Sequence, residues 1–236
     1  ANLSCGASCP VLNDWTLAWS EGIDVSGTAQ AFDQSTNLTS GTVAVAVNDE
    51  LQVGKTGTIS GGNWSIPNVT VFSGDVVTVF IEGANDVNEA VAVMKYDGNG
   101  DISGARLYER HVTLGSTDNQ TITNADLALF DNGAAGDEDV FHEVDAGNDL
   151  AVCYNVVTGG CFETELYIRS GNTYRPDSSS SGNVATRHIE NNGTITMDGN
   201  TFTMTGSWDN NGTSTANTST VVFAATSTTE TVDSTG

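Results

Sequence analysis

Two stretches near the end of the chain share one pattern: NNGTITMDGNTFTM at residues 191–204 and NNGTSTANTSTVVF at residues 210–223. Their offset of 19 residues aligns Thr201 with Thr220 and Phe202 with Val221. A period near 20, with Asn-Gly corners and alternating Thr and apolar positions, is typical of a β-solenoid, whose coils stack their inward side chains. We therefore predict a short β-solenoid over residues 190–225. A plain β-meander is the alternative, because two copies fall short of the usual three or more.

The composition of the whole chain also favours β-structure. The 236 residues include 26 Gly and only 3 Pro, and Thr, Ser and Asn are abundant, which favours strands and turns over helices. Seven Lys and Arg against 30 Asp and Glu give a formal charge of −23. So acidic a chain is repelled by nucleic-acid phosphates and anionic membranes, which excludes both as default partners. No apolar run approaches the roughly 20 residues of a transmembrane helix.

The pattern of short strands divides the chain into three parts. Residues 1–21 form an N-terminal segment, and residues 22–83 contain alternating strands broken by Gly, Asn and Asp, which predict a small β-sandwich. Residues 84–236 predict a second β-domain with the repeat at 190–225. The fold class is therefore all-β, an N-terminal β-sandwich followed by further β-structure. Strands of the second domain are expected near Glu89–Tyr96, Arg106–Leu114, Leu127–Phe130, Leu150–Cys153 and Leu166–Arg169.

Two parts of the chain resemble known protein families. The segments IDVSGTAQAFDQSTNLTSGTVAVAV (23–47), GNWSIPNVTV (62–71) and SGDVVTVFIEG (73–83) resemble the carboxypeptidase-regulatory-like and related immunoglobulin-like modules of bacterial surface proteins. In those families the module is a spacer or binding scaffold without active-site residues. The segment NTFTMTGSWDNNGTSTANTSTVVFAATST (200–228) resembles the Thr/Asn-rich repeats of bacterial adhesin-type β-helical proteins. The resemblances imply a β-protein of the bacterial cell surface.

The four cysteines form two close pairs in the sequence, Cys5 with Cys9 and Cys153 with Cys161. Proximity favours two local disulfides, with free thiols as an alternative. A zinc site fits poorly, because its usual signature is two C-x2-C motifs. Disulfides indicate an oxidising compartment, and an Ala at position 1 fits a signal-cleavage product, with deliberate trimming as the alternative. We expect an extracellular, cell-surface location.

The N-terminal segment contains a candidate donor strand. Trp15, Leu17 and Trp19 alternate with smaller residues, so a strand would place all three on one face. Three large apolar side chains need a groove to cover them, in this chain or in a neighbour. Insertion into a neighbour's sheet would satisfy both the side chains and the backbone, as in donor-strand complementation of pili and fimbriae. The C-terminal strand, Thr220–Ala225, is the second choice for the inserted segment.

One loop has the spacing of a calcium site. Asp97, Asn99 and Asp101 place oxygen ligands at alternate positions, as a calcium loop does at positions 1, 3 and 5. Ile102 stands where the sixth-position Gly of an EF-hand belongs, and Tyr108 where the bidentate Glu belongs. Calcium is thus the one cofactor that the sequence predicts, with a Gly-rich surface turn as the alternative.

No catalytic constellation stands out in the sequence. His111, His142 and His188 are far apart and lack metal-ligand spacing, and neither a nucleophile elbow nor a phosphate loop occurs. We therefore expect a structural subunit of an extracellular filament, pilus or surface layer that assembles with copies of itself, and not an enzyme. The alternative is a secreted adhesin or carbohydrate-binding module that uses exposed aromatic residues, with Trp64 and Trp208 as candidates that fit core positions equally. A polysaccharide-active enzyme on a β-helical scaffold is the third reading.

Overall fold

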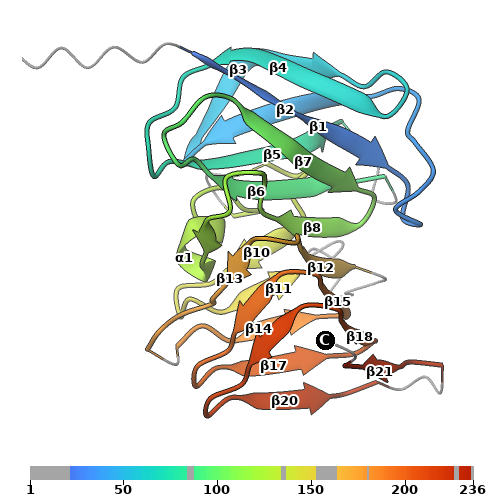
Figure 1. Ribbon diagram of the computed structural model, residues 1–236, viewed down its shortest axis with the longest axis vertical. Helices are drawn as coiled ribbons and strands as arrows, with labels where there is room; N and C mark the ends of the chain where they lie inside the picture. Colours follow the sequence, from blue (N-terminus) through green and yellow to red (C-terminus); the bar gives the residue numbers. More distant parts are fainter. Residues whose placement is uncertain are drawn as a thin grey trace, which may run out of the picture.

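The computed structural model describes residues 22–83, 88–133, 137–152, 164–179, 181–225 and 229–234 (Figure 1). Within these ranges the chain forms 21 strands and a single four-residue helix, α1 (Asn124–Leu127). The prediction of an all-β fold is confirmed.

The N-terminal part is a sandwich of two sheets. One sheet has the order β4–β1–β7, with β1 antiparallel to β4 and parallel to β7. The other contains β3, β2, β5 and β6 in that order, all antiparallel. The strand bounds are β1 (Ile23–Gln30), β2 (Thr42–Val47), β3 (Glu50–Thr58), β4 (Asn63–Val69), β5 (Val76–Glu82), β6 (Val91–Lys95) and β7 (Ile102–Tyr108). Because β6 and β7 belong to it, the sandwich extends beyond residue 83.

The central strands of the larger sheet are buried on both faces. In β2, Val43 and Val45 face the sandwich core, while Ala44 and Ala46 face a second core. This arrangement explains why β2 and β5 are nearly continuous apolar runs. The second core continues downward in Figure 1 into the rest of the molecule.

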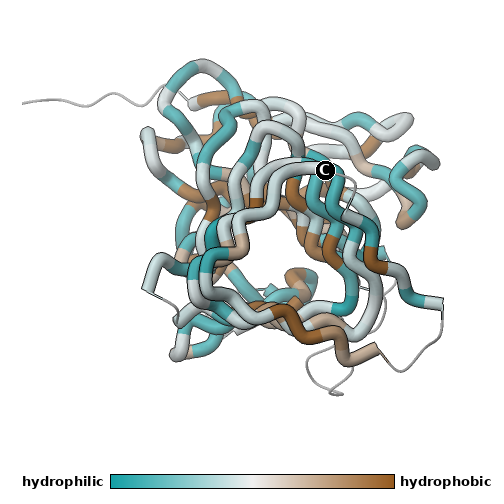
Figure 2. The backbone as a smooth tube through the Cα atoms, turned by 60° about the horizontal axis from the view of Figure 1, so that its bottom comes forward, coloured by the Kyte–Doolittle hydropathy of each residue, from teal (hydrophilic) through white to brown (hydrophobic). Residues whose placement is uncertain are grey.

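The C-terminal part is a β-solenoid made of three parallel sheets. The chain visits the three sheets in turn (Figures 1 and 2). Each later full coil contributes one strand to each sheet, and the first coil contributes two strands to the third sheet. The first sheet continues the sandwich through parallel pairing of β6 with β8. It contains β8 (His111–Leu114), β12 (Glu165–Ile168), β15 (His188–Asn191), β18 (Trp208–Asn210) and β21 (Val232–Asp233). The second contains β9 (Thr121–Ile122), β13 (Thr173–Tyr174), β16 (Thr194–Thr196) and β19 (Thr213–Thr215). The third contains β10 (His142–Val144), β11 (Leu150–Val152), β14 (Val184–Thr186), β17 (Thr201–Met204) and β20 (Thr220–Phe223), with β10 antiparallel to β11.

The register of the coils is the one that the repeat predicts. Thr201 pairs with Thr220 and Phe202 with Val221, in parallel. Asn191 pairs with Asn210 in the same way, and its amide donates to Asn210 Oδ1 at 2.6 Å in the interior. The parallel pairing excludes the β-meander.

The solenoid also extends further toward the N-terminus than the repeat indicates. Coils begin at β8, β12, β15 and β18. Glu165 pairs in register with both His111 and His188, so the step along the chain from the first coil to the second is longer than the step from the second to the third. The long first coil contains α1, which corrects the strand expected at Leu127–Phe130. A capping box between Thr123 and Asp126 starts a helical turn there instead.

Candidate assembly surface

The last coil exposes side chains that every earlier coil buries. Phe202 and Met204 on β17 point inward and are fully buried, because β20 covers them. Their register partners on β20, Val221 and Phe223, are 36% and 48% exposed. Figure 2 views the coils from this end and shows the apolar stretch of β20 at the front rim. We call this surface, formed by β19, β20 and β21, the open end.

The open end also presents unpaired backbone. β19, β20 and β21 are each the last strand of their sheet among the described residues. Natural edge strands are usually protected by Lys, Pro, bulges or a covering element. β20 has the sequence Thr-Val-Val-Phe, and residues 210–229 contain no Asp, Glu, Lys, Arg or His. In a chain of charge −23, β19 and β20 therefore lack both the features that protect an edge strand and the acidic charge that repels other copies, whereas β21 carries Asp233.

The opposite end of the solenoid is closed. The apolar interior of the coils continues into the face of the larger sandwich sheet that carries Phe80. Residues that follow α1 cover this face, and Phe130 stacks on Phe80 at 5.8 Å between ring centroids. In Figure 1 the sandwich and α1 lie over this end, while β20 forms the far end.

A polar cluster lies on the outer face of the first solenoid sheet, where the sandwich loop between β1 and β2 covers it. Gln34 of that loop donates to Glu190 Oε2 at 2.6 Å and lies 3.3 Å from His111 Nε2. His111 is fully buried, and its Nε2 lies 3.3 Å from Glu165 Oε2. Glu165 stands in register between His111 and His188. No sequence motif predicts this cluster, because its residues lie far apart in the chain.

The two glutamates of this cluster have opposite pKa shifts. Burial raises the pKa of Glu190, its hydrogen bonds from Gln34 and Asn192 oppose this, and the charge of Glu165 adds to the rise. Burial also acts upward on the pKa of Glu165, but the hydrogen bond and charge of His111 outweigh it and lower that pKa. Pairs with divergent pKa values occur in acid–base catalysis. Here Glu165 is 13% exposed and neither cavity described below opens onto the pair. The cluster joins the sandwich loop to the first solenoid sheet through the hydrogen bond of Gln34 with Glu190.

The predicted calcium residues lie together in the turn between β6 and β7. Asp97 Oδ1 accepts from the backbone N–H of Asn99 at 2.7 Å, and Asp101 Oδ1 accepts from that of Asp24 at 2.9 Å. The carboxylate of Asp118 accepts from the Asp97 N–H at 3.2 Å. In the described part of the chain no three His, Cys, Asp or Glu side chains are placed to hold a metal. Calcium binding stays a prediction.

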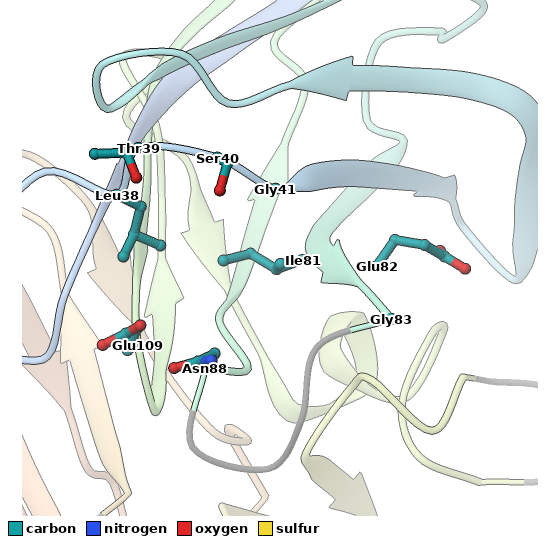
Figure 3. Close-up of a pocket in the computed structure, with 9 residues that line it drawn as sticks. All are labelled: Leu38, Thr39, Ser40, Gly41, Ile81, Glu82, Gly83, Asn88 and Glu109. Carbon is teal, nitrogen blue, oxygen red and sulfur yellow. The ribbon is translucent and has the colours of Figure 1, made fainter.

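Cavities on the sandwich include two that described residues line. The first, of about 330 Å³, has Leu38 and Ile81 along its middle and Glu82 and Glu109 at its ends (Figure 3). Burial and the charges of Asp137 and Asp139 raise the pKa of Glu82. The second, of about 320 Å³, includes Phe72, which is 52% exposed.

The remaining predicted site residues divide into two groups. Trp64 and Trp208 are buried in the two cores, at 4% and 6% exposure, so neither can stack on a sugar. The others lie outside the described residues: Trp15, Leu17 and Trp19, and the pairs Cys5–Cys9 and Cys153–Cys161. The donor-strand and disulfide predictions therefore remain predictions.

The chain matches no protein-family model, no curated protein and no solved structure. Among the described residues, no helix has the length and apolar character that crossing a membrane requires.

Proposed function

We propose that this protein is a structural subunit of an extracellular assembly, joined to its neighbours through exposed strand edges. The single observation that carries the proposal is the open end, where β20 combines free backbone with exposed Val221 and Phe223. No described strand covers β20, and the interior side chains at the end of a solenoid need a capping element or a partner to bury them. The proposed role is structural rather than catalytic.

The distribution of charge supports the same role. At −23, two subunits repel one another over most of their surface, so a contact must be apolar and backbone-mediated or cation-bridged. The open end meets the first condition, since it is uncharged over residues 210–229. The segment with Trp15, Leu17 and Trp19 is a second proposed contact, worth several kcal/mol at roughly 1.5–3 kcal/mol per buried side chain. The cysteine pairs and the resemblances to surface modules fit an extracellular location.

Sedimentation velocity over a concentration series, followed by negative-stain microscopy, tests the proposal. We expect concentration-dependent assemblies larger than the monomer, and fibres or ordered layers where both contacts act. Substituting Val221→Asp on the open end should reduce assembly, whereas Val53→Asp on the sandwich, at an 89% exposed position, should not. Monomers at every concentration would contradict the proposed function.

Glycan binding is the second candidate function, and one observation favours it. Phe72 is half exposed beside the cavity of about 320 Å³, and Asp49, Glu50 and Asp75 border the same cavity. An exposed ring next to hydrogen-bonding groups is a common arrangement for sugar recognition. A glycan array with wild type and Phe72→Ala tests it, and equal signals from both would exclude this site.

A further inference from the structure

The open end is suited to contact with a second copy of itself. Any acidic surface of this chain meets repulsion from another copy, but residues 210–229 carry no charge of either sign. The exposed inward positions, Val221 and Phe223, need an apolar cover, and an identical open end provides one. Asp233 on β21 is the one charged residue in the three strands of the open end, so a charged partner would gain little attraction there.

The closed end of the solenoid determines the symmetry of such a contact. A head-to-tail stack would place the open end of one copy on the other end of the next, as in open filaments. That end is covered by the sandwich, because β8 already pairs with β6 and the interior continues into the sandwich sheet. Open end can therefore meet open end, which is an isologous contact with two-fold symmetry.

The last strands of the coil fit one another under this symmetry. Each coil advances by one strand spacing, about 4.8 Å, over three sides, so each side stands about a third of a spacing above the one before. A two-fold axis through the side of β20 exchanges the other two sides. When β20 lies one spacing from β20 of the second copy, β21 lies one spacing from β19 of that copy. The additional strand β21 of each copy therefore compensates for the lower position of β19 in the other copy, so that all three sides of the two solenoids meet.

The register that pairs the apolar positions places the axis at Val222. Val221 then faces Phe223 of the second copy inside the joined solenoids, and the two Val222 residues meet on the outside. This inside and outside assignment follows the register with β17, in which Val221 and Phe223 continue the inward row of Phe202 and Met204.

We propose that two copies of this protein join open end to open end, with their β20 strands antiparallel across a two-fold axis at Val222. The inference rests on the proposed function and specifies it: the partner at this surface is a second copy, and the contact closes at two. Growth beyond the dimer then needs a different contact.

Disulfide trapping tests the register. Residues directly opposite in an antiparallel pair have Cα atoms about 4.5 or 5.5 Å apart, and both distances lie within the range of a disulfide. Under mild oxidation Val222→Cys should give a covalent dimer on a non-reducing gel, with a 222–222 crosslink in its peptide map. Wild type reports the background of the four native cysteines, and Val53→Cys is the matched control on the sandwich. A dimer that forms without this crosslink would overturn the register and the axis.

Sedimentation equilibrium tests the stoichiometry independently. Wild type should form the dimer as its first associated species, with longer polymers only where the N-terminal contact also acts. Val221→Asp with Phe223→Asp should weaken that dimer at least about 100-fold, because buried unpaired carboxylates would face one another. Val53→Asp should leave it unchanged. Polymers that the double variant forms as well as wild type would overturn the two-fold contact and leave the proposed function standing. Monomers at every concentration would contradict both the two-fold contact and the proposed function.

Discussion

Replacing Gly193 by Ala should destabilise the solenoid strongly, because the added Cβ would clash with the preceding coil and not because of the backbone dihedrals of Gly193. Gly193 occupies the corner of the Asn-Asn-Gly-Thr repeat, and it has no positive φ. A Cβ added there would lie 2.5 Å from Arg169 O and closer still to Asn172 O, both of them backbone atoms of the preceding coil. The glycine is needed because two coils approach at this corner within contact distance.

The magnitude follows from what must move. Real Cβ atoms do not come within 3.0 Å of such neighbours, so the two coils must separate by about 0.5 Å or more. Asn172 O accepts a ladder hydrogen bond from the Thr194 N–H at 2.9 Å, and that bond weakens as the coils separate. Overpacking of about 1–3 kcal/mol and a lost hydrogen bond of about 1 kcal/mol together give a loss of about 3 kcal/mol. For a domain of this size the melting temperature should fall by roughly 6–12 °C.

Thermal and urea unfolding followed by circular dichroism measure the loss, with Gly147→Ala as the matched control. Gly147 also has no positive φ, but its nearest neighbour is the side-chain end of Asp145 at 3.0 Å, which can turn away. Gly212→Ala should have an intermediate effect, because its Cβ meets Gly193 but its coil is the last and can shift outward. If Gly193→Ala unfolds at the same temperature as Gly147→Ala, close coil packing does not explain the repeat's glycine.

Three further predictions concern protonation, calcium and the cysteines. Glu190 has a raised pKa, so its contribution to stability is present below its ordinary pKa and lost as the pH rises through the folded value. Acidification from neutral pH to about pH 5 should therefore lower the melting temperature of Glu190→Gln more than that of wild type. Both proteins lose stability through buried His142, whose pKa is lowered to about 4, and only wild type gains from protonation of Glu190. The lowered pKa of Glu165 keeps that group's contribution intact in this window, and an equal change of melting temperature in wild type and Glu190→Gln would contradict the assignment. If calcium binds the 97–101 turn, EDTA should lower the melting temperature of wild type and leave the Asp97→Ala, Asp101→Ala double variant unaffected. A non-reduced peptide map should contain Cys5–Cys9 and Cys153–Cys161, and a crosslink between the two pairs would disprove that pairing.

The parts of the fold that were predictable from sequence are those with local periodicity. Alternation over Thr42–Val47 predicted a strand, and the repeat predicted the pairing of Phe202 with Val221 that the structure contains. Both patterns work because each position faces the same environment as its neighbour one strand or one coil away. The pairing of the last coils could be predicted from the sequence because these coils have equal lengths.

The earlier coils were not predictable, because their lengths differ. The step from His111 to Glu165 includes α1 and β10, so no fixed period relates the first coil to the second. The polar cluster was hidden for a similar reason. Gln34 and Glu190 meet only because the sandwich loop folds over the outer face of the solenoid, and no local pattern marks a contact across 156 residues.

Whether this protein forms closed dimers or long polymers depends on how many different contacts each copy has. An isologous contact at the open end uses that surface in both copies and leaves nothing there for a third. A filament then requires a second contact, and the segment with Trp15, Leu17 and Trp19 is the proposed one. Deleting residues 1–20 should therefore convert filaments into dimers. Val221→Asp should instead leave single head-to-tail chains joined through the N-terminal segment, because strand insertion is a heterologous contact. If the deletion leaves filaments of normal length, the second contact lies elsewhere on the sandwich, where Val53 and Phe72 are the exposed apolar residues of the described chain.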